Sequence, residues 1–253
     1  DYARQFHREP IPVSELVIGM KCGGSDGLSG ITANPTVGQF SDMLVARGGA
    51  TVLTEVPEMF GAETILMNRC ISKDVFDKAV DMINGFKNYF IRHNEVVYDN
   101  PSPGNREGGI TTLEDKSCGC VQKGGTAPIM DVIGYGDPVV TKGLNMLYGP
   151  GNDLVSATAM TAAGAHIILF TTGRGTPFGA PAPTLKISTN SQLAENKKGW
   201  IDFDAGSIVS GETIDEAAKR LLELVIETAS GKQTQTERRG YRSISIFKEG
   251  VVL

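Results

Sequence analysis

The sequence predicts an α/β fold, because short apolar segments alternate with amphipathic helical segments along much of the chain. The clearest strand is HIILFT at residues 166–171, a nearly continuous apolar run of the kind found in strands buried on both faces. The chain has 253 residues, of which 40% are hydrophobic, so a sizeable core can form. We therefore expect a mainly parallel sheet with helices on both faces, in a Rossmann-like layered architecture.

Composition and charge argue against nucleic-acid and membrane partners and bear on where in the cell the protein is expected. The net charge of −5 predicts no broad attraction to nucleic acid or to an anionic membrane. No apolar run approaches the roughly 20 residues that a membrane-spanning helix needs, and the polar start DYARQFHREP is not a signal peptide. We expect a cytoplasmic protein with a tail at residues 1–12 and one α/β domain at residues 13–253. The first residue is not methionine, which favours a fragment of a longer chain.

In the first half, Asn34 is a candidate helix cap and Pro35 suits the first helical position. Apolar residues at helical spacing (Val37, Phe40 and Leu44) then continue towards glycines that end the helix. The further predictions are a strand at 50–54, helices at 61–70 and 73–94, a loop at 99–109, a helix at 111–123 and a strand at 128–133.

In the second half, Thr213 opens a capping box, T-I-D-E, at the start of an amphipathic helix that ends near Gly231. Small residues predict a close-packed helix at 153–163. The predicted strands are 144–147, 166–171, 184–187 and an alternating terminal segment, 243–247.

Polar loops follow several of the predicted apolar segments, at 22–34, 55–58, 101–105 and 171–177. In a parallel sheet, loops at the carboxyl ends of strands gather along one edge. Together these loops supply backbone N–H groups, a thiol, carboxylates and a guanidinium. That set suits a small polyhydroxylated or carboxylated ligand.

Individual residues in these loops allow two interpretations each. Arg174, between two glycines, could clamp a carboxylate or be a solvated turn residue. Glu55 could be a general base or metal ligand, or a structural carboxylate near the next helix. Asp26 could bind metal or sugar hydroxyls, or form an Asx turn. Asn34 favours the helix cap over a ligand contact.

The four cysteines predict reduced thiols, because no spacing resembles a zinc site and Cys118 and Cys120 are too close for an easy mutual disulfide. Cys22 is a candidate metal ligand because it opens a glycine-rich loop. With only three histidines in the chain, a metal would need oxygen or thiolate ligands, or histidines from elsewhere. No P-loop is present.

Six motifs in order resemble one family. They are MKCGGSDGLSGITANP, LTEVPEMFGAE, NPSPGN, KGLNMLYGPGND, TTGRGTPFGAPAPTLKI and WIDFDAG. Together they resemble the carboxyl-terminal part of the altronate dehydratase family, which includes galactarate dehydratase and, more distantly, the large subunit of sulfolactate sulfo-lyase. TEVPEMFGAE and KGLNML…GPGND look more like the altronate enzymes.

The resemblance implies a hydro-lyase that converts D-altronate to 2-keto-3-deoxy-D-gluconate and water in hexuronate catabolism. It implies a divalent metal, with Fe(II) expected, and an amino-terminal domain that this chain lacks; a homo-oligomer is also compatible with it. The alternatives are galactarate dehydration, sulfite elimination from sulfolactate, or a non-catalytic sugar-acid-binding domain of the longer enzyme.

Dehydration of a 2,3-dihydroxy acid requires a base for the C2 proton, cations for the enediolate and an acid for the C3 hydroxyl. We expect Arg174 to bind the substrate carboxylate, and Glu55 or Asp26 to act as base. Cys22 and Glu55 are the expected metal ligands. The expected substrate-binding residues are Ser25, Asn34, Asn105, Asn152, Thr172, Gly173, Gly175 and Lys186.

Overall fold

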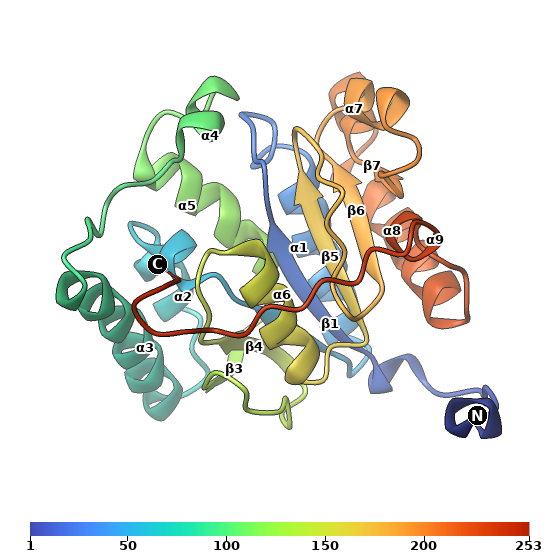
Figure 1. Cartoon of the computed structure of the whole chain (residues 1–253), viewed down its shortest axis with the longest axis horizontal. Coiled ribbons are helices and arrows are strands. Elements are labelled where there is room, and N and C mark those ends of the chain that lie inside the picture. The colour runs from blue at the N-terminus through green and yellow to red at the C-terminus, as the bar shows by residue number, and fades with distance from the viewer. Residues whose placement is uncertain (253) are drawn as a thin grey trace.

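The computed structural model describes residues 1–252, which form an α/β fold around a seven-stranded sheet (Figure 1). Every strand pairing is parallel, and the spatial order is β3-β4-β2-β1-β5-β6-β7. The predicted fold class is therefore confirmed. The strands are β1 Val17–Cys22, β2 Ala50–Leu53, β3 Ile129–Ile133, β4 Gly143–Leu147, β5 Ile167–Thr172, β6 Thr184–Ser188 and β7 Phe203–Asp204.

Helices cover both faces of this sheet. Helices α1, α3 and α8 contribute buried apolar residues to the larger core cluster on one face, whereas α6 packs with a smaller cluster on the other. The helices are α1 Ala33–Val45, α2 Glu63–Met67, α3 Lys73–Arg92, α4 Pro103–Glu107, α5 Leu113–Val121, α6 Asp153–Ala162, α7 Ser191–Asn196, α8 Ile214–Ala229 and α9 Gln235–Arg238.

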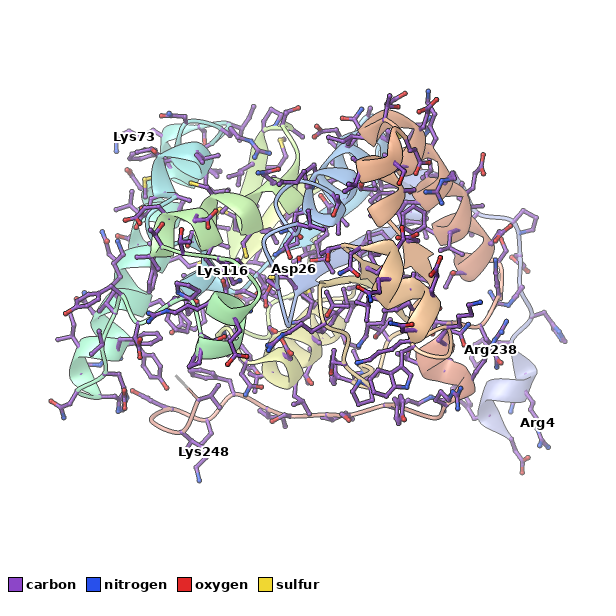
Figure 2. All side chains as sticks on the ribbon, turned by 90° about the horizontal axis from the view of Figure 1, so that it is seen from above. Arg4, Asp26, Lys73, Lys116, Arg238 and Lys248 are labelled. Atoms are coloured by element: carbon purple, nitrogen blue, oxygen red, sulfur yellow. The ribbon has the colours of Figure 1, made fainter. Side chains whose placement is uncertain are left out.

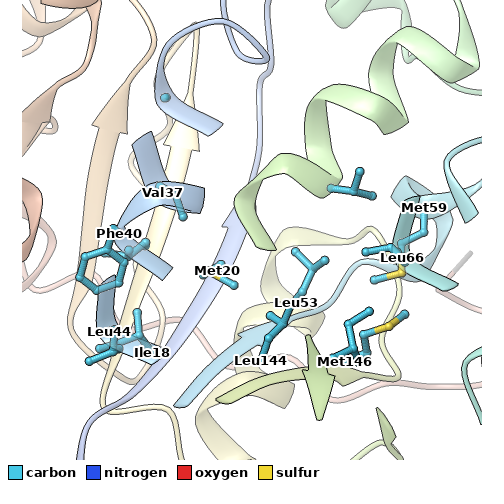
Figure 3. Packing of buried hydrophobic residues seen from close by; sticks show 14 of the residues in the cluster. Ile18, Met20, Val37, Phe40, Leu44, Leu53, Met59, Leu66, Leu144 and Met146 are labelled. Carbon is cyan, nitrogen blue, oxygen red and sulfur yellow. The ribbon is translucent and has the colours of Figure 1, made fainter. Parts of the chain in front are cut away.

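Helix α1 shows how the sequence pattern builds the core. Its residues Val37, Phe40 and Leu44 are fully buried and lie beside Ile18 and Met20 of β1 (Figure 3). The predicted helical spacing is thus confirmed, because these three side chains form one stripe that faces the sheet. This packing fixes the central strand, whose carboxyl end carries the candidate site.

Of the two helix caps predicted from the sequence, one is present in the structure and the other is not. Thr213 and Glu216 form the predicted reciprocal capping box at the start of α8. Asn34, in contrast, lies inside α1, which begins at Ala33 after Thr32. The cap prediction for Asn34 is wrong, and its amide is free to bond to other segments.

Two further predictions about local structure are wrong. The segment 99–109 is not all loop, because Pro103 at the first helical position and the Ser102 cap start the short helix α4. Residues 243–247 form no strand. They run as an extended strap across the α6 face, where the N–H of Ser243 donates to the Gly179 carbonyl at 2.8 Å and that of Phe247 to the Tyr135 hydroxyl at 2.8 Å. The alternating pattern therefore reflects a half-exposed covering segment.

Strand β1 was not among the predicted strands. It continues through Lys21 and Cys22, which pair in register with Phe170 and Thr171 of β5. The glycine-rich loop therefore starts at Gly23, after the cysteine. Within residues 1–252, no helix combines the length and apolarity that crossing a membrane requires.

Helical glycines test how tightly α1 is packed. A Cβ at Gly38 would collide with the carbonyl oxygen of Gln122 and approach the Gly125 nitrogen to 3.1 Å. We expect Gly38→Ala to lower the free energy of unfolding in urea by about 1–3 kcal/mol, because backbone must move. Gly85 in α3 has open space around its Cα, so Gly85→Ala is the matched control and should stabilise by about 0.5–1 kcal/mol. Equal effects of the two substitutions would contradict this packing.

Candidate active site

Lys21 lies at the centre of a buried charge cluster at the carboxyl edge of the sheet. Its side chain is 0% exposed, and its Nζ is 2.9 Å from Glu55 Oε1 and 2.8 Å from Asp153 Oδ1. The ammonium also donates to Ser156 Oγ at 3.1 Å. Burial by itself lowers the pKa of Lys21, but the charges of Asp153 and Glu55 outweigh burial and raise the pKa above its ordinary value. Lys21 is therefore a fixed positive charge.

Glu55 follows β2 and is held in an unusual backbone conformation. Its φ of 66° and ψ of 60° are left-handed, which costs a non-glycine residue about 1–3 kcal/mol. This conformation turns the carboxylate towards β1, where Oε2 accepts the N–H of Cys22 at 3.0 Å and lies 3.6 Å from Lys123 Nζ. Burial, together with the charge of Cys22, raises the pKa of Glu55 to about 7. A carboxyl group in that range can both accept and donate a proton near neutral pH.

A pair of sulfur atoms lies beside Glu55. Cys22 Sγ and Cys120 Sγ are 3.4 Å apart, and both residues are buried. Helix α5 places Lys116 one turn before Cys120, so that its Nζ lies 2.9 Å from Cys120 Sγ and 3.7 Å from Cys22 Sγ. Lys116 also forms an ion pair with Glu58.

The two thiols titrate differently. The hydrogen bond with Cys120 and the nearby ammonium groups of Lys116, Lys123 and Lys21 lower the pKa of Cys22, whereas burial opposes them. The same hydrogen bond with Cys22, together with burial, raises the pKa of Cys120. The shared hydrogen bond and the neighbouring lysines therefore favour the thiolate form of Cys22 and the protonated form of Cys120.

A cavity of about 200 Å³ opens next to this cluster. Its walls are the loop after β1, at residues 25–31, and helix α5, which contributes Lys116 and Cys120. Figure 2 shows Lys116 and Asp26, on the two walls, close together near the middle of the molecule. The cavity is large enough for a small polar molecule, and Lys116 is the cation that borders it.

The structure places the predicted thiol, carboxylate and guanidinium at the same edge of the sheet. Cys22 Sγ is 3.7 Å from Glu55 Oε2. Arg174 follows β5, and its backbone N–H donates to the carbonyl of Gly24 at 3.2 Å. Its exposed guanidinium lies against Gly104 of α4, and across residues 1–252 it has no hydrogen-bond or ion-pair partner. It is therefore available to an anion from outside this part of the chain.

Several residues expected to bind substrate have side chains that already brace the loops. Asn34 donates to the Gly119 carbonyl at 2.9 Å and accepts from Thr171 at 2.7 Å. Asn105 donates to the Ser25 carbonyl at 3.0 Å, and Asn152 caps α6.

The remaining expected residues show the same pattern. Asp26 accepts from Thr189 at 2.8 Å and forms an Asx-type turn with Leu28. Thr172 accepts the N–H of Gly175 at 2.9 Å, in the turn that also contains Gly173. Ser25 is buried and borders the cavity. The roles of all these residues in substrate binding stay predictions.

The predicted metal ligands do not form a complete site within this part of the chain. Cys22 and Glu55 lie together, but residues 1–252 contain no group of three or more histidine, cysteine, aspartate or glutamate side chains that could hold a metal ion. The ammonium groups of Lys21 and Lys116 are hydrogen-bonded to these same acceptors. A metal would therefore need further donors from outside this chain.

Sequence reasoning missed Lys21, Lys116 and Lys123 and named Lys186 only as an expected substrate-binding residue, although a signal for buried lysines exists. Lys21 stands in VIGMKC and Lys186 in TLKIS, both of which form buried strands. A lysine in such a strand needs a carboxylate or a carbonyl partner. Lys116 and Cys120 are four residues apart, which predicts one helix face, but nothing in the sequence shows that this face meets Cys22. The other members that were missed are Glu58 and Asp153.

The fold and this cluster define an α/β domain with a buried charged site at the carboxyl edge of a parallel sheet. The family model described as D-galactarate/Altronate dehydratase, C-terminal, matches residues 13–252, so the chain belongs to that family.

Three relatives place the chain within the family. It is 56% identical to altronate dehydratase of Escherichia coli and 58% identical to altronate dehydratase of Bacillus subtilis, in each case over 99% of this chain. It is 38% identical to galactarate dehydratase (L-threo-forming) of Escherichia coli over 98% of this chain. The chain spans about half the length of these relatives, 50%, 51% and 48% respectively.

Lys21 and Lys186 form a natural comparison, because both are buried and lie over the ring of Phe170, at 4.9 and 4.2 Å from its centroid. Within residues 1–252, the Lys186 ammonium has only the Thr176 carbonyl as hydrogen-bond partner, at 2.9 Å, and burial lowers the pKa of Lys186 to about 7. We expect Lys21→Met to lower the free energy of unfolding by about 3–5 kcal/mol, because buried Glu55 loses its counter-charge. Lys186→Met should leave the free energy of unfolding unchanged or raise it at pH 7, because Lys186 has no carboxylate partner that would lose its counter-charge. Chemical denaturation measures both, and an equally stable Lys21→Met protein would contradict the role of the ion pairs.

The pH dependence of the stability of Lys186→Met tests the charge state of Lys186. The folded protein releases the Lys186 proton near pH 7, whereas the unfolded chain holds it until about pH 10.4. The unfolded state binds more protons between these values, so Lys186 makes stability rise with pH by up to about 1.4 kcal/mol per unit. The stability of Lys186→Met relative to that of the unmodified protein should therefore fall from pH 7 to pH 9. A difference that stays constant over that range would show that Lys186 keeps its charge.

Proposed function

We propose that this chain is the carboxyl-terminal catalytic part of a sugar-acid hydro-lyase that converts D-altronate to 2-keto-3-deoxy-D-gluconate and water. The observation that carries this proposal is the identity to two altronate dehydratases over nearly the whole chain, which exceeds that to the galactarate enzyme. The cavity supports it, because its hydroxyl, amide and carboxylate groups beside the Lys116 ammonium suit a small polyhydroxylated ligand.

The chemistry requires a base and a nearby positive charge. Removal of the C2 proton creates an enediolate, whose oxygens need fixed cations in a water-poor site. Glu55 is the proposed base, since its pKa of about 7 matches proton transfer near neutral pH. Lys116 is the proposed stabilising cation, because it borders the cavity and its neighbouring thiolate and carboxylate, which outweigh its burial, raise its pKa above the ordinary value. It therefore acts by charge and leaves proton transfer to Glu55.

Arg174 is the proposed carboxylate clamp. Its guanidinium is exposed at the same sheet edge, and it rests on Gly104, where any side chain would collide with it. Five N–H donors in a planar fork can bind a carboxylate through two parallel hydrogen bonds. This would orient the substrate with its acidic C2 proton towards the interior of the site.

We also propose that the complete enzyme binds a divalent cation, with Fe(II) the expected ion. Since Cys22 and Glu55 alone do not make a site, the proposal assigns the missing donors to the half of the enzyme outside this chain. Metal analysis of the complete enzyme and of this chain alone tests the assignment. Cation bound equally well by this chain alone would contradict it.

The rest of the proposed setting follows from the same resemblance. It comprises hexuronate catabolism in the cytoplasm, an amino-terminal domain of the same protein as the main partner, and a homo-oligomeric assembly. Nucleic acid and membranes are not proposed partners.

The proposal predicts the reaction of the complete enzyme. Incubation with D-altronate and Fe(II) should give 2-keto-3-deoxy-D-gluconate, which NMR detects directly. Galactarate and sulfolactate are the comparison substrates, and faster turnover of either would reassign the enzyme within the family. No product from any hexonate or hexarate would remove the hydro-lyase proposal. Binding of altronate without turnover would favour the alternative, a sugar-acid-binding domain.

The clamp makes a separate prediction. In the complete enzyme, Gly104→Ala should displace the Arg174 guanidinium and raise KM for altronate by roughly tenfold to a hundredfold, the cost of about 1.5–3 kcal/mol for a charged hydrogen bond. The kcat should change little, because the clamp binds substrate and transition state alike. Gly85→Ala, at an open position in α3, is the matched control. An unchanged KM in Gly104→Ala would exclude Arg174 as the carboxylate ligand.

A further inference from the structure

The turn that carries Arg174 is bound on one side by the loop after β1. The N–H groups of Gly173 and Arg174 both donate to the carbonyl of Gly24, at 2.9 and 3.2 Å. The N–H of Gly175 donates to Thr172 Oγ1 at 2.9 Å. These bonds use the N–H groups of the turn, so its carbonyl groups are left for donors from another segment.

Helix α7 supplies those donors through the two residues that flank it. The helix lies at the carboxyl edge of the sheet, beside β6 and β7 (Figure 1). Asn190, its N-cap, donates to the Gly173 carbonyl at 3.1 Å. Lys197, its C-cap, donates from Nζ to the Arg174 carbonyl at 2.9 Å. Two consecutive carbonyl groups of the turn are thus bound by the two ends of one helix.

The side chain of Lys197 is itself held in place. Its Nζ lies over the ring of Trp200, 4.7 Å from the ring centroid. A Cβ at Gly175, whose φ of 79° is left-handed, would lie only 3.1 Å from Lys197 Cδ, so the lysine stem packs directly on the turn. Within residues 1–252, the Arg174 carbonyl is the only hydrogen-bond acceptor of this ammonium, and no carboxylate pairs with it.

We propose that Lys197 is a positioning residue for the Arg174 clamp, an inference that rests on the proposed function. Its bond to the Arg174 carbonyl fixes the peptide unit between Arg174 and Gly175. The direction in which the Arg174 side chain leaves the backbone is fixed with it, and the guanidinium rests on Gly104. Two parallel hydrogen bonds to a carboxylate demand such a fixed plane. Without the bond, the glycines on both sides of Arg174 leave the turn free to move.

The neighbouring Lys198 separates the two properties of Lys197 that could serve the substrate, its charge and its bond to the turn. Lys198 is exposed on the same surface, and within residues 1–252 it forms no hydrogen bond or ion pair. Methionine at either position removes one positive charge, but only Lys197→Met removes the bond. Lys197→Arg keeps a long side chain with N–H donors for the carbonyl.

Steady-state kinetics of the complete enzyme with D-altronate test the proposal. Lys197→Met should raise KM by about threefold to tenfold, which corresponds to the loss of one hydrogen bond. The kcat should change little, because the clamp binds substrate and transition state alike. Lys197→Arg should restore most of the lost affinity, and Lys198→Met should leave KM unchanged. In an Arg174→Gln background, Lys197→Met should have no further effect, because its action passes through Arg174.

Three kinetic results would overturn the proposal. The first is an unchanged KM in Lys197→Met. The second is an equal rise of KM in Lys198→Met, which would assign the effect to charge alone. The third is a full further loss in the Arg174→Gln background, which would show that Lys197 acts independently of Arg174.

Hydrogen–deuterium exchange of the complete enzyme without substrate tests the same bond without reference to activity. The N–H groups of residues 173–175 should exchange about threefold to tenfold faster in Lys197→Met than in the unmodified enzyme or in Lys198→Met. Unchanged exchange in Lys197→Met would overturn the positioning role. An unmodified enzyme inactive on every sugar acid would refute the proposed function, while the exchange of this turn would still decide whether Lys197 holds it.

Discussion

The structure depends on the neutralisation of buried charge at the carboxyl edge of the sheet. Lys21 belongs to the central strand and has no access to solvent, so its ammonium is tolerable only because Glu55 and Asp153 bind it. The Glu55 carboxylate comes from the turn that follows the neighbouring strand β2, and the Asp153 carboxylate comes from the first turn of α6. The requirement to meet Lys21 therefore fixes how β1, β2 and α6 are placed relative to one another.

The same requirement explains the strained backbone at Glu55. A left-handed conformation is unfavourable for glutamate, but it brings one carboxylate to Lys21, Lys123 and the N–H of Cys22 together. The strain is offset by three favourable interactions in a low-dielectric site. Strain maintained in this way is typical of functional sites, since it holds a reactive group in place before the substrate arrives.

The polar side chains of the loops around the site hold the loops in place, whereas the buried cluster concentrates charge. Neighbouring backbone and side-chain groups already occupy the hydrogen-bonding atoms of Asp26, Asn34 and Asn105. They make the rim rigid, and a rigid rim keeps the cavity beside Lys116 open. Arg174 differs from them, because its guanidinium is exposed and unpaired within residues 1–252. The exposed guanidinium at the rim and the buried charges of the interior thus belong to separate residues.

The sequence by itself determined the α/β class, most helices and the location of the polar loops. Those properties depend on local periodicity and capping, as the α1 stripe and the Thr213 box show. Only the tertiary structure decided that Lys116 and Cys120 meet Cys22, and that residues 243–247 cover a helix and form no strand. Contacts between residues about a hundred positions apart depend on how α5 packs against β1, and no local pattern records that packing. The sequence could suggest a buried lysine at position 21, but its partners were fixed by the fold.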